Sequence, residues 1–382
     1  MFLDILERTI IGEKWMPHIE NKNKKSRVLW IDCAKTMAII AVLIDHSNGV
    51  FYTSSWVATS SYFSVSVFVI LAGMTQKMVT LRRKTISGGG QWARITRMLR
   101  DYAIAVFLLQ CFYCRFFDLK TYINYLLNFN IQAPYYFLVF FIQLVAIAPI
   151  LIQWNLYCTQ QKHASWYHLL TFVVLGIIAA IAINYTYILP VHGGGQFLFG
   201  GTFLLLYYCG ITLAGSRIFE VQSKIVLGIA TGMLLGIWIV WIVLMHNGLL
   251  PFDKWMEKYW GNGFNPPSVQ SLLYGVISVF LFYAMFSFLQ QLGNVIINTV
   301  LKGIAWFGKY TLYIFMYHLL VRDAITQLIP SISQNIVIYR LVFIGMFVIP
   351  AVFTYIVQRI SLKWKQLGRS NLYNENNAKQ IG

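Results

Sequence analysis

The sequence KIVLGIATGMLLGIWIVWIVLMH occupies residues 224–246, with one lysine at its start and one histidine at its end. A helix needs about 20 mostly apolar residues to cross the hydrocarbon core of a bilayer, so this run predicts a membrane-spanning helix. Nine further segments fit this length. The ten predicted spans are 28–50, 58–80, 98–117, 134–153, 168–188, 197–214, 224–246, 268–290, 304–328 and 336–358.

The composition of the whole chain agrees with a polytopic, all-α membrane protein. The 382 residues are 58% hydrophobic and 11% charged, whereas a soluble domain has roughly 45–50% apolar and about 25% charged residues. These numbers exclude a soluble globular protein, a disordered chain, a coiled coil and a disulfide scaffold. We expect Cys111 and Cys114, a CxxC pair inside a predicted span, to be packing residues, and we expect no metal site.

The distribution of basic residues orients the ten predicted spans. With the N-terminus in the cytoplasm, 23 Lys and Arg residues fall in cytoplasmic tails and loops, 6 fall in outer loops, and Lys35 lies within the first span. This asymmetry is the one that the positive-inside rule predicts, and it places both termini in the cytoplasm of a cell-membrane protein. The net charge of +17 therefore indicates membrane orientation rather than nucleic-acid binding.

Three regions follow from this arrangement. Residues 1–27 are expected to form a cytoplasmic amphipathic and basic tail without a cleavable signal, residues 28–359 the integral membrane domain, and residues 360–382 a cytoplasmic C-terminal tail. The longest outer connection, 247–267, contains Trp255 and Trp260. These tryptophans fit either the interfacial aromatic belt or a surface that stacks on sugar rings.

The first predicted span carries an unusual set of ionisable residues, because each of them is costly inside a membrane and by default suggests function. Lys35 and His46 are eleven residues apart, so on a helix they share one face about 16 Å apart. Asp32 precedes Lys35 by three residues and can pair with it. Asp45 adjoins His46, whose imidazole can accept a proton near neutral pH.

Simpler roles stay open for these residues. Lys35 can extend to the cytoplasmic interface, and His46 can make an interhelical hydrogen bond. Arg94 and Arg97, which share a helix face at the start of the third span, suit phosphate binding from the cytoplasm. The same arginines also fit the positive-inside bias combined with contacts to lipid headgroups.

The chain resembles the membrane acyltransferase-3 family, and most closely its fucose 4-O-acetylase-like branch. Four elements in chain order carry the resemblance: Trp30–His46, Ser64–Gly73, Arg94–Tyr102 and Phe307–His318. The segment 134–143 is also similar to biofilm-polysaccharide proteins of this family, which have been considered both exporters and O-acylating enzymes. The chain departs from the family pattern by having Lys35 in place of an arginine, Ala72 in place of a serine, and Ser66 in place of an aspartate or proline.

The resemblance implies a membrane O-acyltransferase that uses cytoplasmic acyl-CoA, most simply acetyl-CoA, and a hydroxyl of an extracytoplasmic or lipid-linked glycan. We expect Arg94 and Arg97 to hold the phosphates of coenzyme A, with Lys35 and Asp32 along the path of its pantetheine arm. His46 would act as general base or as a transient acyl carrier, with Asp45 or a neighbouring helix orienting it and His318 assisting. The alternatives are a polysaccharide exporter or flippase and a membrane sensor without chemistry.

Overall fold

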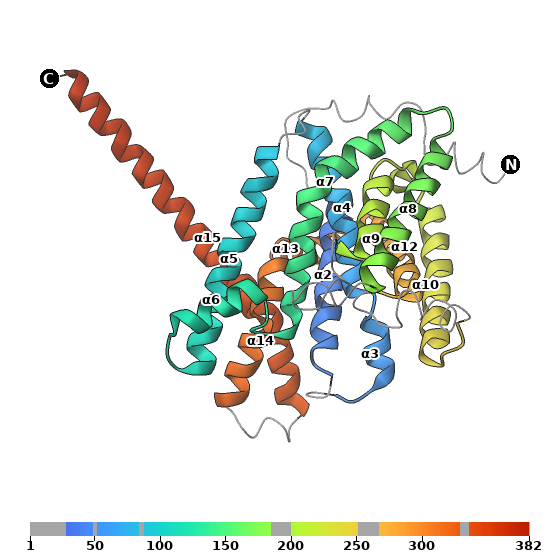
Figure 1. Cartoon of the computed structure of the whole chain (residues 1–382), viewed down its shortest axis with the longest axis horizontal. Coiled ribbons are helices and arrows are strands. Elements are labelled where there is room, and N and C mark those ends of the chain that lie inside the picture. Colours follow the sequence, from blue (N-terminus) through green and yellow to red (C-terminus); the bar gives the residue numbers. More distant parts are fainter. Residues whose placement is uncertain are drawn as a thin grey trace. The chain divides into compact units, whose positions relative to one another are not determined.

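A computed structural model describes residues 28–48, 52–83, 88–184, 200–250, 267–328 and 336–381, which form helices and contain no strand (Figure 1). The chain divides into two compact units, residues 1–308 and 309–382. The first contains α2 (Leu29–Asp45), α3 (Ser55–Ser61), α4 (Ser64–Arg83), α5 (Gly88–Cys114), α6 (Leu119–Asn128), η1 (Ala133–Tyr135), α7 (Tyr136–Gln160), α8 (Ala164–Asn184), α9 (Phe203–Leu213), η3 (Arg217–Glu220), α10 (Lys224–His246), α12 (Val269–Gln291) and α13 (Val295–Phe307). The second contains α14 (Thr311–Leu328) and α15 (Ile336–Ile381).

Six helical segments in the described part of the chain are long and apolar enough to cross a membrane. They are Ser55–Arg82, Tyr136–Gln160, Ala164–Ala182, Lys224–His246, Val269–Gln291 and Tyr339–Trp364. Each overlaps a predicted span, and α10 has the predicted bounds 224–246. The predicted class, an all-helical membrane protein, is therefore confirmed. The tail 1–27 and the residues Trp255 and Trp260 lie outside the described residues.

The ninth predicted span, 304–328, is wrong as a single helix. The structure ends α13 at Phe307 and begins α14 at Thr311, so the predicted span straddles a break between two helices. Hydropathy alone misses this break because both sides of it are apolar. The predicted spans leave out most of α13, because the segment before residue 304 is predicted to be mostly a cytoplasmic connection.

Close helix crossings in the first unit occur at glycines. A Cβ added to Gly73 of α4 would lie 2.2 Å from the carbonyl oxygen of Tyr207 in α9, and one added to Gly210 of α9 would lie 2.0 Å from that of Ile70 in α4. Small residues allow helix backbones to approach in this way, and packing of this kind drives helix association in membranes. Gly73 is the last residue of one of the four elements that carry the family resemblance. Close packing of α4 against α9 explains why a glycine stands at this position.

Side-chain contacts gather the helix ends of the first unit into two groups. Lys77 in the last turns of α4 hydrogen-bonds Asn155 near the end of α7, and Trp30 at the start of α2 stacks on Phe219 of η3. We call this group, which also contains Lys35 and Arg94, the basic end. At the other group, the histidine end, Asp45 and His46 close α2. Helices that alternate in direction across a bilayer produce this grouping.

The connection after α5 contains the short helix α6. The Asp118 carboxylate caps its start by accepting a hydrogen bond from the backbone N–H of Thr121 at 2.8 Å. Hydrogen bonds from Thr121 hold the pKa of Asp118 below its ordinary value. The Tyr102 hydroxyl of α5 donates to the Tyr125 carbonyl at 2.9 Å, so α6 folds back along α5.

The second unit contains α14 and α15, which pack together. α15 continues as one helix through residue 360, where we placed the start of the C-terminal tail, and reaches Ile381. Pro350 lies inside this helix.

Candidate active site on helix α2

The predicted stripe on α2 faces the interior of the first unit. Ile39 is 0% exposed and Val42 is 4% exposed, and both lie between Lys35 and His46, which are themselves half-buried. The helix packs against α4, α12 and α13. This face of α2 is buried at its middle and partly open at Lys35 and at His46. The spacing of these two residues predicts such a face if they line one internal site.

Lys35 and Asp32 form the expected pair at the basic end. Their side chains approach to 3.8 Å, and the Asp32 carboxylate is largely buried whereas Lys35 keeps about a fifth of its side chain exposed. The Thr36 hydroxyl fixes this turn to α13 by donating to the Ile304 carbonyl at 2.7 Å. A Cβ on Gly308 would lie 2.0 Å from the Asp32 carbonyl oxygen, so α13 fits against α2 only with glycine there.

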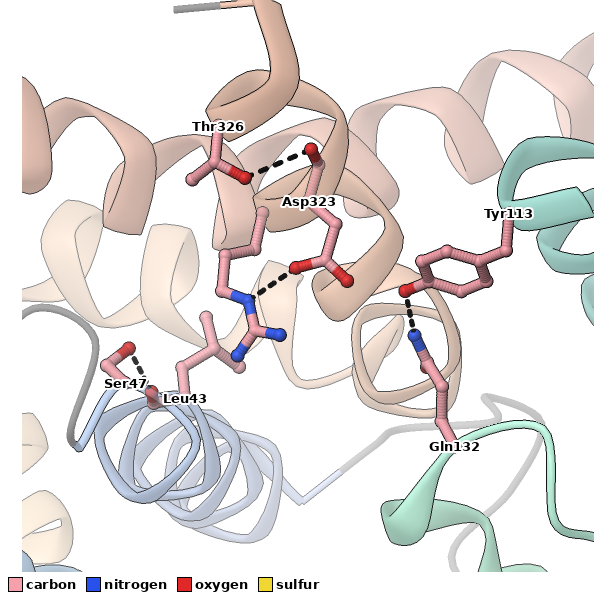
Figure 2. Close-up of polar contacts among 7 residues, drawn as sticks. Leu43, Ser47, Tyr113, Gln132, Asp323 and Thr326 are labelled. Atoms are coloured by element: carbon pink, nitrogen blue, oxygen red, sulfur yellow. Dashed lines mark hydrogen bonds and ion pairs between the residues drawn. The ribbon is translucent and has the colours of Figure 1, made fainter. Parts of the chain in front are cut away.

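The histidine end closes α2 with a network of backbone contacts. His46 is the C-cap and its N–H donates to the Val42 carbonyl at 3.0 Å. The Ser47 hydroxyl donates to the Leu43 carbonyl at 2.6 Å (Figure 2), and the Tyr52 hydroxyl donates to the Ile44 carbonyl at 2.6 Å. These bonds hold the position of His46 relative to the rest of α2.

The carboxylate of Asp45 makes no hydrogen bond or ion pair with the described residues, including His46. It lies within electrostatic range of three phenols, those of Tyr52, Tyr62 and Tyr136. Burial, followed by the nearby Asp45 charge, raises the pKa of Tyr52 to about 12. Asp45 thus lies in a tyrosine-rich surrounding next to His46.

The arginines at the start of α5 point in different directions, although their spacing places them on one helix face. Arg94 is half-buried, donates a hydrogen bond to Oε1 of Gln76 in α4, and lies 5.7 Å from the ring centroid of Phe141 in α7. Arg97 is exposed, and Arg100 pairs with its neighbour Asp101 at 2.6 Å. Arg94 therefore serves the interior of the basic end and Arg97 its surface.

His318 belongs to the second unit and is described there alone. Its side chain is 1% exposed, and Nδ1 lies 2.7 Å from the Phe315 carbonyl and 3.2 Å from the Ile314 carbonyl of the same helix. Since a carbonyl only accepts, these contacts require a proton on Nδ1. One turn further along α14, Arg322 pairs with Asp323 at 2.7 Å, and the Asp323 carbonyl accepts from Thr326 (Figure 2).

The basic end also contains a buried polar network that the sequence did not predict. Lys77 is 4% exposed and donates to Oδ1 of Asn155 at 2.7 Å, and Asn155 donates to the Thr212 hydroxyl at 3.0 Å. His168 of α8 lies 3.0 Å from the Tyr208 hydroxyl. The count of basic residues assigned Lys77 to a cytoplasmic loop, although Lys77 lies within the predicted span 58–80. A lysine inside a predicted span is the sequence signal that could have indicated this network.

One comparison with known protein families finds a match. A family model described as "Acyltransferase domain", the acyltransferase-3 model, matches residues 28–355. The chain therefore belongs to the acyltransferase-3 family, and it is a membrane acyltransferase by class. No curated protein and no solved structure matches the chain.

Proposed function

We propose that this protein is an O-acyltransferase that moves an acyl group, most simply acetyl, from cytoplasmic acyl-CoA to a hydroxyl of an extracytoplasmic or lipid-linked glycan. The proposal rests on family membership and on one observation above all. A cation and an imidazole lie on one face of α2, about three helical turns apart, with buried residues between them. Such a face suits a donor that arrives from one side and an acceptor that arrives from the other.

In the proposed reaction, neutral His46 accepts the proton of the acceptor hydroxyl as its oxygen attacks the thioester carbonyl. The new C–O bond forms, the C–S bond breaks, and the proton leaves with the thiolate of coenzyme A. Lys35 and Asp32 lie along the path of the pantetheine arm, and Arg94 and Arg97 bind phosphate at the basic end. We also propose a helper role for His318.

Replacing His46 by alanine tests the assignment. We expect purified His46→Ala to lose at least a hundredfold in transfer of label from acetyl-CoA, because general-base catalysis typically contributes 10²–10⁴-fold. The matched control is His163→Ala, since His163 is exposed and lies outside the proposed site. Wild-type activity in folded His46→Ala protein would refute the proposed base.

The second candidate is a glycan exporter without acyl transfer. The buried polar network around Lys77, Asn155 and His168 favours it, since transport pathways also place polar groups inside helical bundles. Labelled acetyl-CoA supplied to the purified protein separates the two functions. Thioester cleavage with label transfer supports the enzyme, whereas glycan movement without cleavage supports the exporter.

A further inference from the structure

The phenol of Tyr207 is a buried polar group. Tyr207 lies in α9, is 0% exposed, and its hydroxyl makes no hydrogen bond with the residues that the structure describes. Its backbone forms the close crossing with Gly73 of α4, so the residue is held firmly. A buried hydroxyl that is left unsatisfied costs free energy, and each such group in a native structure calls for an explanation.

Arg94 reaches the same part of α4 that Tyr207 packs against, and it has donors to spare. It reaches Gln76, which is three residues beyond Gly73 in α4, and it interacts electrostatically with Tyr207. A guanidinium has five N–H donors, and the described contacts of Arg94 are the Gln76 amide oxygen and the Phe141 ring. Among the described residues, no carboxylate pairs with this half-buried cation.

Lys77, a fully buried cation at the basic end, is satisfied differently. The Lys77 ammonium contacts Oδ1 of Asn155, and a Cβ on Gly215 would lie 3.1 Å from its Nζ, just beyond the end of α9. The carbonyl end of a helix carries partial negative charge and stabilises a cation placed there. Lys77 therefore has a structural role. In the described part of the chain, the Arg94 guanidinium has donors beyond the one that binds Gln76, and the Tyr207 hydroxyl has no acceptor.

We propose that the Arg94 guanidinium and the Tyr207 hydroxyl bind one phosphate group of the acyl donor between α4, α5 and α9. A phosphate oxygen accepts from both groups at once, which satisfies the phenol and neutralises the cation. This inference rests on the proposed function and adds Tyr207 to it. Because Tyr207 is closed from solvent, donor binding also requires the side chains around it to move apart.

The test compares Tyr207→Phe with Tyr208→Phe, which is the same change at the adjacent residue. The Tyr208 hydroxyl already has a partner in His168, so its loss should lower the unfolding temperature without changing donor binding. Loss of the Tyr207 hydroxyl should leave the unliganded unfolding temperature unchanged or raise it. We expect it to weaken the binding of coenzyme A about tenfold.

The probes are coenzyme A, 3′-dephospho-coenzyme A and pantetheine, measured by the shift that each causes in unfolding temperature and by titration. Tyr207→Phe should affect only ligands that carry phosphate, and the 3′-dephospho compound shows whether the ribose phosphate or the diphosphate is held. Equal coenzyme A affinity in wild type and Tyr207→Phe overturns the inference but leaves the donor assignment intact. Failure of wild type to bind coenzyme A overturns both.

Discussion

Gly308 meets the backbone of Asp32 so closely that an added Cβ would lie 2.0 Å from the Asp32 carbonyl oxygen. These two residues are 276 positions apart, and each belongs to an element through which the chain resembles its family. The contact fixes the turn that carries Asp32 and Lys35 against the end of α13. The glycine at 308 is thus a packing requirement of the proposed site.

Gly308→Ala should destabilise the protein, because the backbone oxygen in its way cannot move as a side-chain end can. We expect a cost of about 1–3 kcal/mol, the usual range for overpacking, and reduced acyl transfer. Gly303→Ala in the same α13 helix is the matched control, since its Cβ would meet nothing within 4 Å. It should be neutral or slightly stabilising. Thermal unfolding in detergent checks both, and equal midpoints would contradict the packing argument.

Lys35→Met should raise the KM for acyl-CoA more than it lowers kcat, since Lys35 is proposed to line the donor path and to take no part in proton transfer. A loss of about tenfold in kcat/KM corresponds to about 1.4 kcal/mol of binding. Lys302→Met removes an exposed cation from α13 and serves as the control. Unchanged KM in Lys35→Met would leave Lys35 as an interfacial residue only.

The Lys77–Asn155 pair should show strong non-additivity. Asn155→Leu removes the oxygen that accepts from the buried ammonium, so it should cost about 3 kcal/mol or more. Lys77→Met leaves only the neutral amide oxygen of Asn155 without its donor, so it should lower the free energy of unfolding by about 1–3 kcal/mol. The double variant should be more stable than the sum of the single effects indicates. Additive unfolding free energies would show that the two side chains act independently.

The Asp118 cap should make the start of α6 sensitive to acid. Because folding lowers the pKa of Asp118, its contribution to stability is full above the unfolded pKa of roughly 4 and is lost as the pH falls through the lower folded value. Amide exchange at Thr121, corrected for its intrinsic rate, should therefore accelerate below about pH 4. Asp118→Asn retains an acceptor and should remove the pH dependence. Persistent pH dependence in that variant would point to another group.

Within the candidate site, the sequence predicted local relationships well. The Asp32–Lys35 pair follows from a spacing of three residues on a helix, and the common face of Lys35 and His46 follows from a spacing of eleven. Both depend only on helix geometry. The spacing of Arg94 and Arg97 places both on one helix face, but it does not predict that Arg94 turns inward. Its partners, Gln76 and Phe141, belong to α4 and α7.

The sequence by itself determined the class of the protein, because the length and apolarity of the helices must match the bilayer whatever surrounds them. Only the tertiary structure decided which residues share the interior. The close approach of Gly308 to α2, the burial of Lys77 and the burial of the Tyr207 phenol each depend on a helix distant in sequence. Hydropathy and spacing describe one segment at a time, and backbone approach between segments is a property of the packed bundle.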